Sequence, residues 1–180
     1  SSFLDYNIKN YLDEKFLLSS EANFEIIFNK KFKIKKYQLK SKIDIDNISI
    51  NLKNIDIKNY IKNFEEIIIL KDGIMHLNID NLNKTKIKIK SKYILKEKHK
   101  FKEISLNYSK SKSLEKYNFY IDLTENELNI DEINFHKKKN NEMFLNLNLL
   151  KNKNIYEIKN LKLFNDKNFF NLNNIKLEKN

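Results

Sequence analysis

The chain has 180 residues, the length of one domain, and 41% of them are apolar. Its net charge is +11, every basic residue except the three histidines is a lysine, and cysteine is absent. This composition excludes disulfides, thiolate catalysis and cysteine metal sites, and no apolar run reaches the roughly 18 residues of a membrane span.

Lysine, asparagine and isoleucine are abundant, whereas arginine and valine are absent and glycine occurs once. This bias indicates an AT-rich genome. The positive charge favours anionic partners. A protein selected for phosphate contacts is expected to use arginine, whose planar fork matches phosphate, so nucleic-acid binding is not expected.

The first predicted element is an amphipathic helix over residues 3–17, within an N-terminal region of residues 1–20. The apolar residues of its stripe follow helical spacing and are Leu4, Ile8, Tyr11, Leu12 and Phe16.

From residue 22 to residue 180 the apolar period changes to two, which is typical of strands. A brief return of helical spacing predicts a short internal helix over residues 58–66. Strands at 66–70 and 74–80 are predicted to form a hairpin through Asp72-Gly73, because both residues tolerate positive φ. Further strands are predicted at 85–95, 101–108, 117–124, 127–136, 143–150, 155–164 and 169–178. Their short polar separators allow only antiparallel neighbours.

A pattern of eight positions occurs four times, with apolar residues at positions 1, 3, 6 and 8 and asparagine at position 5. The apolar members of these copies are Ile43, Ile45, Ile48, Ile50, Leu52, Ile55, Ile57, Tyr156, Ile158, Leu161, Leu163, Phe170, Leu172, Ile175 and Leu177. A fifth copy consists of Leu128, Ile130, Ile133 and Phe135. Position 5 is occupied by Asn47, Asn54, Asn160 and Asn174, and by Glu132 in the fifth copy.

The alternation in this pattern slips by one residue after position 3. A β-bulge absorbs one extra residue and returns the later side chains to the original face, while it bends the strand. We therefore predict bulges at position 5 of each copy and one apolar face shared by all copies. The fold expected is mainly β: a long antiparallel meander that forms one curled, groove-like sheet of the β-taco type, in a single domain of residues 1–180.

No combination of residues in the sequence identifies a catalytic reaction. His76, His99 and His136 lie in different segments without a metal-ligand partner at suitable spacing, and one glycine cannot build a phosphate loop. We expect no enzyme, no metal site and no cofactor. The apolar face is then either the core of a closed sheet sandwich or an exposed binding surface.

Two copies, Ile50-Asn51-Leu52-Lys53-Asn54-Ile55-Asp56-Ile57 and Phe170-Asn171-Leu172-Asn173-Asn174-Ile175-Lys176-Leu177, resemble a recurring line of the AsmA-like superfamily. This group includes AsmA, TamB and YhdP, large envelope proteins of Gram-negative bacteria. The likeness covers residues 22 onward, and lysine and asparagine replace the turn glycines usual in the family.

The resemblance implies a periplasmic segment of a larger protein tethered to the inner membrane by an anchor outside residues 1–180. Its groove would carry phospholipid or other acyl chains between the inner and outer membranes during envelope biogenesis, and the family has no catalytic residues. The chain begins at Ser1 rather than methionine, and we expect a fragment.

Two alternatives from other classes remain. One is a closed β-sandwich that acts as an adhesion or scaffold module without lipid. The other is a basic nucleic-acid-binding domain, which needs lysine and aromatic residues side by side on one exposed face. Here the aromatic residues mostly share the apolar positions.

Overall fold

The computed structural model describes residues 12–52, 67–80, 84–95, 100–131, 134–166 and 169–178, of which residues 12–16 and 169 are described by their backbone alone. The described residues form eleven strands, and none of them lies in an α-helix. The strands are β1 (Leu12–Phe28), β2 (Ile34–Asn51), β3 (Ile67–Asp80), β4 (Lys84–Ile94), β5 (Lys102–Ser111), β6 (Leu114–Asp122), β7 (Leu128–Ile130), β8 (Phe135–Lys137), β9 (Phe144–Asn152), β10 (Ile155–Phe164) and β11 (Phe169–Glu178).

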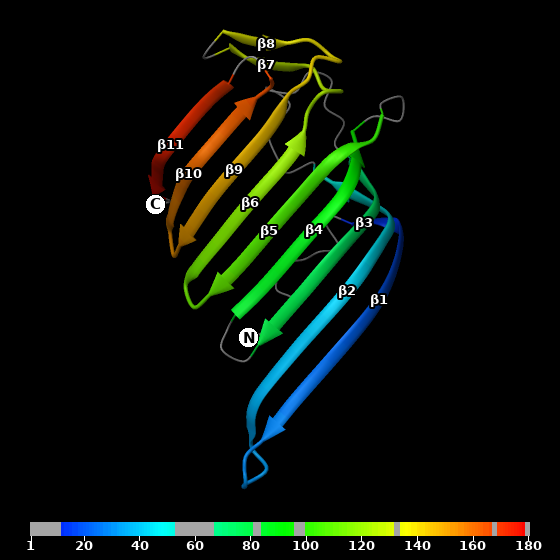
Figure 1. Ribbon diagram of the computed structural model, residues 1–180, viewed down its shortest axis with the longest axis vertical. Coiled ribbons are helices and arrows are strands. Elements are labelled where there is room, and N and C mark those ends of the chain that lie inside the picture. Colours follow the sequence, from blue (N-terminus) through cyan, green and yellow to red (C-terminus); the bar gives the residue numbers. More distant parts are fainter. Residues whose placement is uncertain are drawn as a thin grey trace.

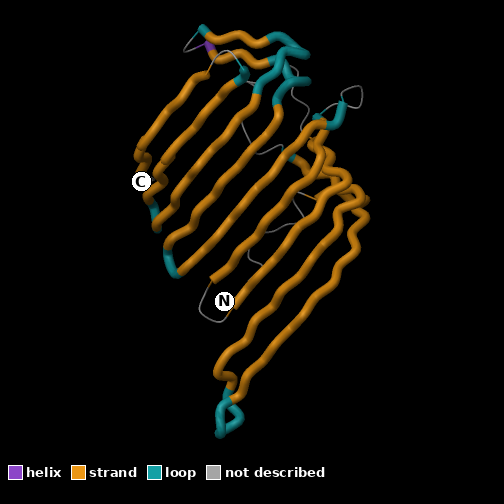
Figure 2. Tube along the Cα trace, viewed as in Figure 1, coloured by secondary structure: helices purple, strands orange, loops and turns teal. Residues whose placement is uncertain are grey.

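Nine strands form one antiparallel sheet in the order β1-β2-β3-β4-β5-β6-β9-β10-β11, which confirms the predicted meander (Figure 1). The predicted strand at 127–136 is wrong. Residues of this segment form β7 and part of β8, which pair with each other as a separate hairpin at one end of the large sheet. Loops are confined to the ends of the strands (Figure 2).

Three hairpin turns use a residue with positive φ that is not glycine. Phe32, Lys112 and Lys153 have φ angles of 56°, 55° and 53°. In the β1–β2 turn the Oδ1 atom of Asn29 accepts hydrogen bonds from the backbone N–H groups of Lys31 and Lys33, at 2.8 and 3.0 Å. The asparagine side chain thus stabilises a tight turn in a chain with a single glycine.

The predicted N-terminal helix is wrong where the structure describes it. Leu12 pairs with Ile50 and Phe16 pairs with Ile48, so both are residues of β1. The hydrogen bonds to β2 override a helical spacing that is only three turns long. The other members of the stripe, and the internal helix predicted at 58–66, lie outside the described residues.

The hairpin predicted at Asp72-Gly73 is also wrong, because β3 runs through both residues. The register to β4 shifts between Lys71 and Ile74, which places one extra residue of β3 opposite β4. Asp72 has a φ of 49°, whereas the φ of Gly73 is not positive. A Cβ atom at position 73 would lie 2.5 Å from Ser91 Oγ, so the glycine is required for space rather than for its backbone freedom.

The large sheet curls around its apolar face. Ile50 of β2 and Phe170 of β11 line the same cavity, although the two strands are seven steps apart in the sheet. In a flat sheet seven strand spacings would separate them by about 34 Å. The sheet therefore brings its two flanks toward each other.

Two groups of buried residues form the core on this face. One is centred on Tyr93 of β4, which is 2% exposed, and the other on Leu163 of β10, which is 4% exposed. Ile121 of β6 packs against both groups, so they form one continuous layer.

Candidate functional site: an apolar groove

The bulge in β10 keeps the apolar face of the sheet continuous. Ile158 pairs with Leu149 and Leu161 pairs with Leu147, so β10 uses one residue more than β9 over this interval. β9 pairs with β6 without any register shift, and residues two apart in a regular strand point to the same side. Ile158 and Leu161 therefore share one face, on either side of Asn160.

The opposite flank of the sheet repeats this arrangement. Ile45 pairs with Leu18 and Asn47 pairs with Leu17, which leaves Asp46 as the extra residue of β2. β3 carries its own extra residue next to β2, at Asp72-Gly73, and β11 carries Asn174 with a φ of 57°. The shifts at Asp46 of β2 and between Ile158 and Asn160 of β10 thus lie beside predicted bulge positions, whereas the shift in β3 falls where a hairpin turn was predicted, and β10 and β11 pair without a shift at Asn174. Asn54 and Glu132 lie outside the described residues.

A cavity of about 680 Å³ lies on the apolar face. Its lining consists of apolar side chains with one serine. The lining residues are Ile50, Leu52, Ile68, Leu70, Ile89, Leu95, Ile104, Ser105, Leu106, Phe119, Ile121, Leu123, Leu128, Ile130, Leu145, Leu161, Leu163 and Phe170. A volume of this size is typical of sites that hold a small molecule.

The predicted lining residues fall into four sets. Those that line the cavity are Ile50, Leu52, Leu128, Ile130, Leu161, Leu163 and Phe170. Those that belong to the packed groups beside it are Ile45, Ile48 and Phe135. Those that are half-buried or exposed elsewhere are Ile43, Tyr156, Ile158, Leu172, Ile175 and Leu177. Those outside the described residues are Ile55, Ile57 and Ile133.

Strand pairing places one residue of the third set, Leu172, on the same transverse row as Leu161 of the cavity lining. Leu161 pairs with Leu172 of β11 and Leu147 of β9. Leu172 is 36% exposed and Leu177 is 52% exposed, so the apolar face becomes more accessible along β11.

Most of the cavity lining in the central strands was missed by the repeated pattern. The missed residues are Ile68, Leu70, Ile89, Leu95, Ile104, Ser105, Leu106, Phe119, Ile121, Leu123 and Leu145. The central strands pair without a bulge, so most of these residues follow plain alternation. That alternation is the sequence signal that could have identified them.

The β7–β8 hairpin closes one end of the cavity. Leu128 and Ile130 of β7 contribute to the lining. The hairpin is fixed by Lys137, whose Nζ donates to the carbonyl oxygens of Thr124, Asn126 and Lys138 at 3.1, 2.6 and 3.1 Å. Burial lowers the pKa of Lys137 to about 8, although the nearby carboxylates, Asp122 foremost, oppose this shift.

Tyr93 adds a second buried polar contact at the same end. Its hydroxyl donates to the carbonyl oxygen of Asp122 at 2.6 Å and lies 3.0 Å from Oδ1 of Asn126. Burial, and then the charge of Asp122, raise the pKa of the hydroxyl far above its usual value. The phenol therefore remains a hydrogen-bond donor that holds the turn of residues 123–126 against the core.

The other end of the apolar face carries a charged row. Glu115 of β6 pairs with Lys110 of β5 and Lys151 of β9, and their side chains form ion pairs at 3.5 and 3.9 Å. Burial alone would raise the pKa of Glu115, but a hydrogen bond from Tyr117 and the two lysines outweigh it and lower the pKa. The groove thus passes from an apolar interior to a polar rim.

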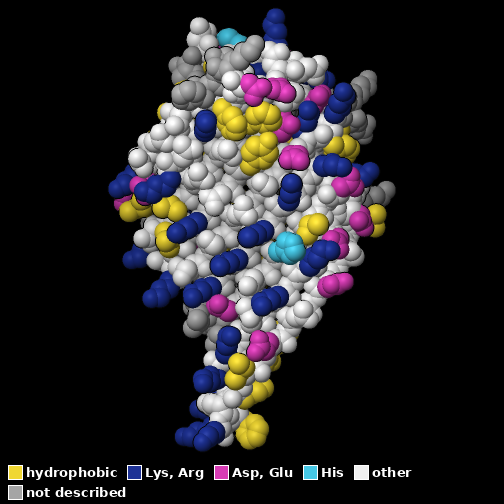
Figure 3. Space-filling model, in the orientation of Figure 1, with side chains coloured by type: hydrophobic (Ala, Val, Ile, Leu, Met, Phe, Trp, Pro, Cys, Tyr) yellow, Lys and Arg dark blue, Asp and Glu magenta, His cyan; other side chains and the backbone are white. Residues whose placement is uncertain are grey.

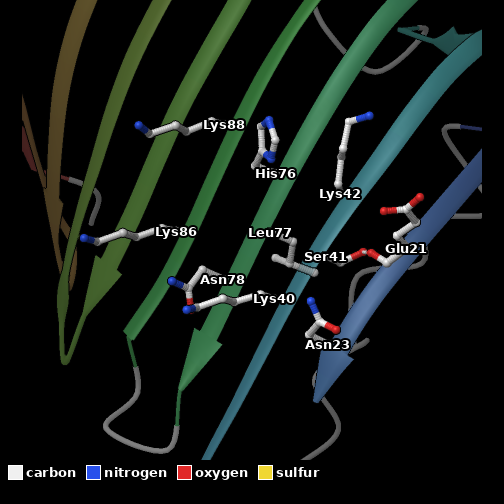
Figure 4. Close-up of a pocket in the computed structure, with 10 residues that line it drawn as sticks. All are labelled: Glu21, Asn23, Lys40, Ser41, Lys42, His76, Leu77, Asn78, Lys86 and Lys88. Carbon is white, nitrogen blue, oxygen red and sulfur yellow. Dashed lines mark hydrogen bonds between the residues drawn. The ribbon is translucent and has the colours of Figure 1, made fainter. Parts of the chain in front are cut away.

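The opposite face of the sheet is polar. Rows of basic side chains cross it in Figure 3, and Lys40, Lys42, Lys86, Lys88 and His76 surround a shallow hollow of about 530 Å³ there (Figure 4). The transverse row that contains His76 continues in the pairing as five asparagines, which are Asn107, Asn118, Asn148, Asn160 and Asn173.

Hydrogen bonding and aromatic packing stabilise this outer face. Asn160 Nδ2 donates to Asn173 Oδ1 at 2.8 Å. Tyr120 stacks on Phe144 with ring centroids 6.2 Å apart, and Phe164 packs against Phe144 at a tilt with centroids 5.5 Å apart. These three aromatic rings lie on the outer face, although the sequence predicted that aromatic residues mostly share the apolar face. They pack together in a half-buried cluster.

The described residues show no cluster of three or more carboxylate or histidine groups that would hold a metal ion. Within the same residues, no helix is long and apolar enough to cross a membrane. Comparisons with protein-family models, with curated proteins and with solved structures gave no match. The apolar lining of the cavity is therefore the observation from which a function of this site can be argued.

Proposed function

We propose that the chain is a non-enzymatic lipid-binding and transport segment whose groove holds acyl chains. The single observation that carries this proposal is the cavity of about 680 Å³, in which Ser105 is the one residue that is not apolar. Water gains nothing from such a lining, because a buried water needs two to four polar partners. A flexible hydrocarbon chain, in contrast, gains free energy along its whole length.

The energetics of an acyl chain fit transport as well as binding. Each buried CH₂ group contributes about 0.8 kcal/mol, and no hydrogen bond fixes the chain at one position. Binding is then strong in sum, tolerant of chain type and permissive of sliding along the groove. The row of Lys110, Glu115 and Lys151 offers a polar end at which a charged headgroup would lie.

The place of action that we propose is the periplasm, in a longer protein tethered to the inner membrane, with phospholipid passing between the inner and outer membranes. The support for this part is the resemblance of residues 50–57 and 170–177 to the AsmA-like line. Fractionation of cells that express the full-length protein tests it, and recovery in the cytoplasm would refute it.

The alternative is a scaffold module whose apolar face is an ordinary core without lipid. Against this alternative, the described residues contain one large sheet and one two-stranded hairpin, and no second large sheet packs on the apolar face among them. The lipid content of the purified protein separates the two readings.

The test is organic extraction and native mass spectrometry of protein purified without detergent. We expect co-purified phospholipid in the parent chain. Two matched substitutions in β5 test whether the lipid lies in the cavity. Leu106 lines the cavity, and its neighbour Asn107 is exposed on the outer face. Leu106→Asp should remove the lipid, because an unpaired charge in an apolar channel costs several kcal/mol. Asn107→Asp should retain it.

A third variant covers the case in which Leu106→Asp fails to fold. Leu106→Trp fills the cavity without adding charge, and it should lower the amount of bound lipid while the circular dichroism spectrum stays that of a β protein. A lipid-free parent chain, or equal lipid loss in Leu106→Asp and Asn107→Asp, would refute the proposal.

A further inference from the structure

The β1–β2 hairpin projects beyond the rest of the large sheet (Figure 1). The pairing between β2 and β3 ends at Gln38 and Asp80, whereas β1 and β2 continue to pair with each other as far as Phe28 and Ile34. Among the described residues, the outer part of the hairpin is thus a two-stranded ribbon. A ribbon of this kind has no sheet neighbour to cover its side chains.

The end of this ribbon exposes large apolar side chains. Phe32 is 88% exposed at the turn, and Phe28 and Ile34 are 54% and 58% exposed beside it. Single exposed apolar residues need no explanation, but a cluster at the tip of a projecting element marks a binding surface.

The same segment is basic without any acidic residue. Residues 26–43 contain seven lysines and no aspartate or glutamate, and five of these lysines lie within residues 30–36. The outermost of them flank the exposed rings, and the lysines are Lys30, Lys31, Lys33, Lys35, Lys36, Lys40 and Lys42. Apolar side chains surrounded by lysine are the combination that binds an anionic membrane surface.

The apolar strip of the ribbon is continuous with the groove. Phe24 and Ile26 lie two residues apart in β1, on the same face, and pair with Leu39 and Tyr37 of β2. Leu39 and Ile43 lie four residues apart in one strand, so they point to the same face. The strip therefore leads from the tip toward the apolar face of the sheet.

We propose that the tip of the β1–β2 hairpin inserts into the surface of an anionic phospholipid membrane. Phe28, Phe32 and Ile34 enter the boundary between headgroups and acyl chains, and the lysines bind the lipid phosphates. An anionic membrane fits better than a protein partner because an apolar tip within a wholly basic segment matches the layered chemistry of a bilayer. This docking needs no lipid in the groove and is therefore independent of the proposed transport.

The chain contains no tryptophan, so a tryptophan placed at the tip is a specific reporter of insertion. Phe32→Trp should show a blue-shifted emission and quenching by brominated lipid with vesicles of phosphatidylcholine and phosphatidylglycerol. The matched control is Asn141→Trp, which lies in an exposed loop between β8 and β9. Its emission should not change with the same vesicles.

Cosedimentation with the same vesicles tests the two chemical parts of the tip. Phe32→Ser should weaken binding, and Lys30→Glu combined with Lys31→Glu should weaken it further, since each lysine near an anionic surface contributes about fivefold in affinity. Lys86→Glu combined with Lys88→Glu changes the charge equally on the outer face of β4 and should have a smaller effect.

Leu106→Trp, which is expected to keep the fold and to lose bound lipid, should bind vesicles as the parent chain does, and this separates the inference from the proposed function. An unshifted tryptophan at position 32, an equal shift at position 141, or equal binding to vesicles of phosphatidylcholine alone would overturn the inference.

Discussion

Replacing Lys137 by methionine isolates the effect of a buried ammonium group at the closed end of the groove. Lys137 is 3% exposed, and its Nζ donates to three backbone carbonyl oxygens that fix the β7–β8 hairpin. Methionine has a similar length without charge or donors. The substitution leaves the carbonyl oxygen of Asn126 without this donor, whereas those of Thr124 and Lys138 still accept from the backbone N–H groups of Asn140 and Asn141 at 2.9 and 3.4 Å. A buried acceptor that loses its donor costs about 1–3 kcal/mol at neutral pH.

The pH dependence of this cost follows from the lowered pKa of Lys137. The pKa is about 8 in the folded chain, against 10.5 for an unperturbed lysine. Between these values the unfolded chain holds the proton and the folded chain does not, so the free energy of unfolding rises with pH. A shift of about 2.5 units at 1.36 kcal/mol per unit gives a gain of about 3 kcal/mol from pH 7 to pH 10.5.

Urea unfolding followed by circular dichroism at several pH values measures this gain. The difference in the free energy of unfolding between the parent chain and Lys137→Met should rise with pH, because the two proteins share all their other titratable groups. Lys138→Met, at an exposed neighbouring position, should show no such difference from the parent. A difference that stays constant or falls with pH would mean that the three carbonyl hydrogen bonds outweigh burial, and the reasoning would be wrong.

Two further substitutions test the packing beside the groove. Gly73→Ala should destabilise by about 1–3 kcal/mol in urea unfolding, because its Cβ would meet the side chain of Ser91, whose hydroxyl donates to the Lys71 carbonyl oxygen. Adding Ser91→Gly should recover part of the loss, and full additivity would contradict the steric explanation. Tyr93→Phe should cost about 1–3 kcal/mol, since the Asp122 carbonyl oxygen loses its buried donor; an unchanged midpoint would contradict this role.

Much of the C-terminal half of the fold could be predicted from sequence. The predicted strands 155–164 and 169–178 coincide with β10 and β11. Their apolar alternation is regular, and the polar separators are too short for anything but antiparallel pairing. Local information is sufficient where each strand pairs with its neighbour in the chain.

The N-terminal helix failed for the opposite reason. Leu12 and Phe16 fit a helical stripe, but their structure is decided by hydrogen bonds to Ile50 and Ile48, more than thirty residues away. Propensity over a short segment is a weak guide when a long neighbouring strand offers a full set of backbone partners.

Buried polar residues gave no signal in the sequence. Lys137 is one lysine in a run of three, and the lysine and asparagine residues around it are typical of a solvated loop. Its ammonium group donates to the carbonyl oxygens of Thr124 and Asn126, which precede β7 and lie 13 and 11 residues earlier in the chain. Tyr93 likewise occupies an ordinary strand position, and its role depends on a turn about thirty residues later in the chain.

The distribution of bulges explains how one sheet becomes a groove. Register shifts occur in the flanking pairs, between β3 and β4 and between β9 and β10, while β4, β5, β6 and β9 pair with one another without any shift. A bulge bends its strand and increases the local twist.

The asparagine pattern marks these bending flanks. Ile68, Leu70, Gly73 and Met75 show the same spacing in β3, with Asp72 at position 5. This sixth copy is hidden from a search for apolar residues, because the space next to Ser91 demands glycine at position 6. Plain alternation in the central strands and a one-residue slip in β3 and β10 therefore keep the apolar residues of the pattern on one face, where the two flanks of the sheet approach each other.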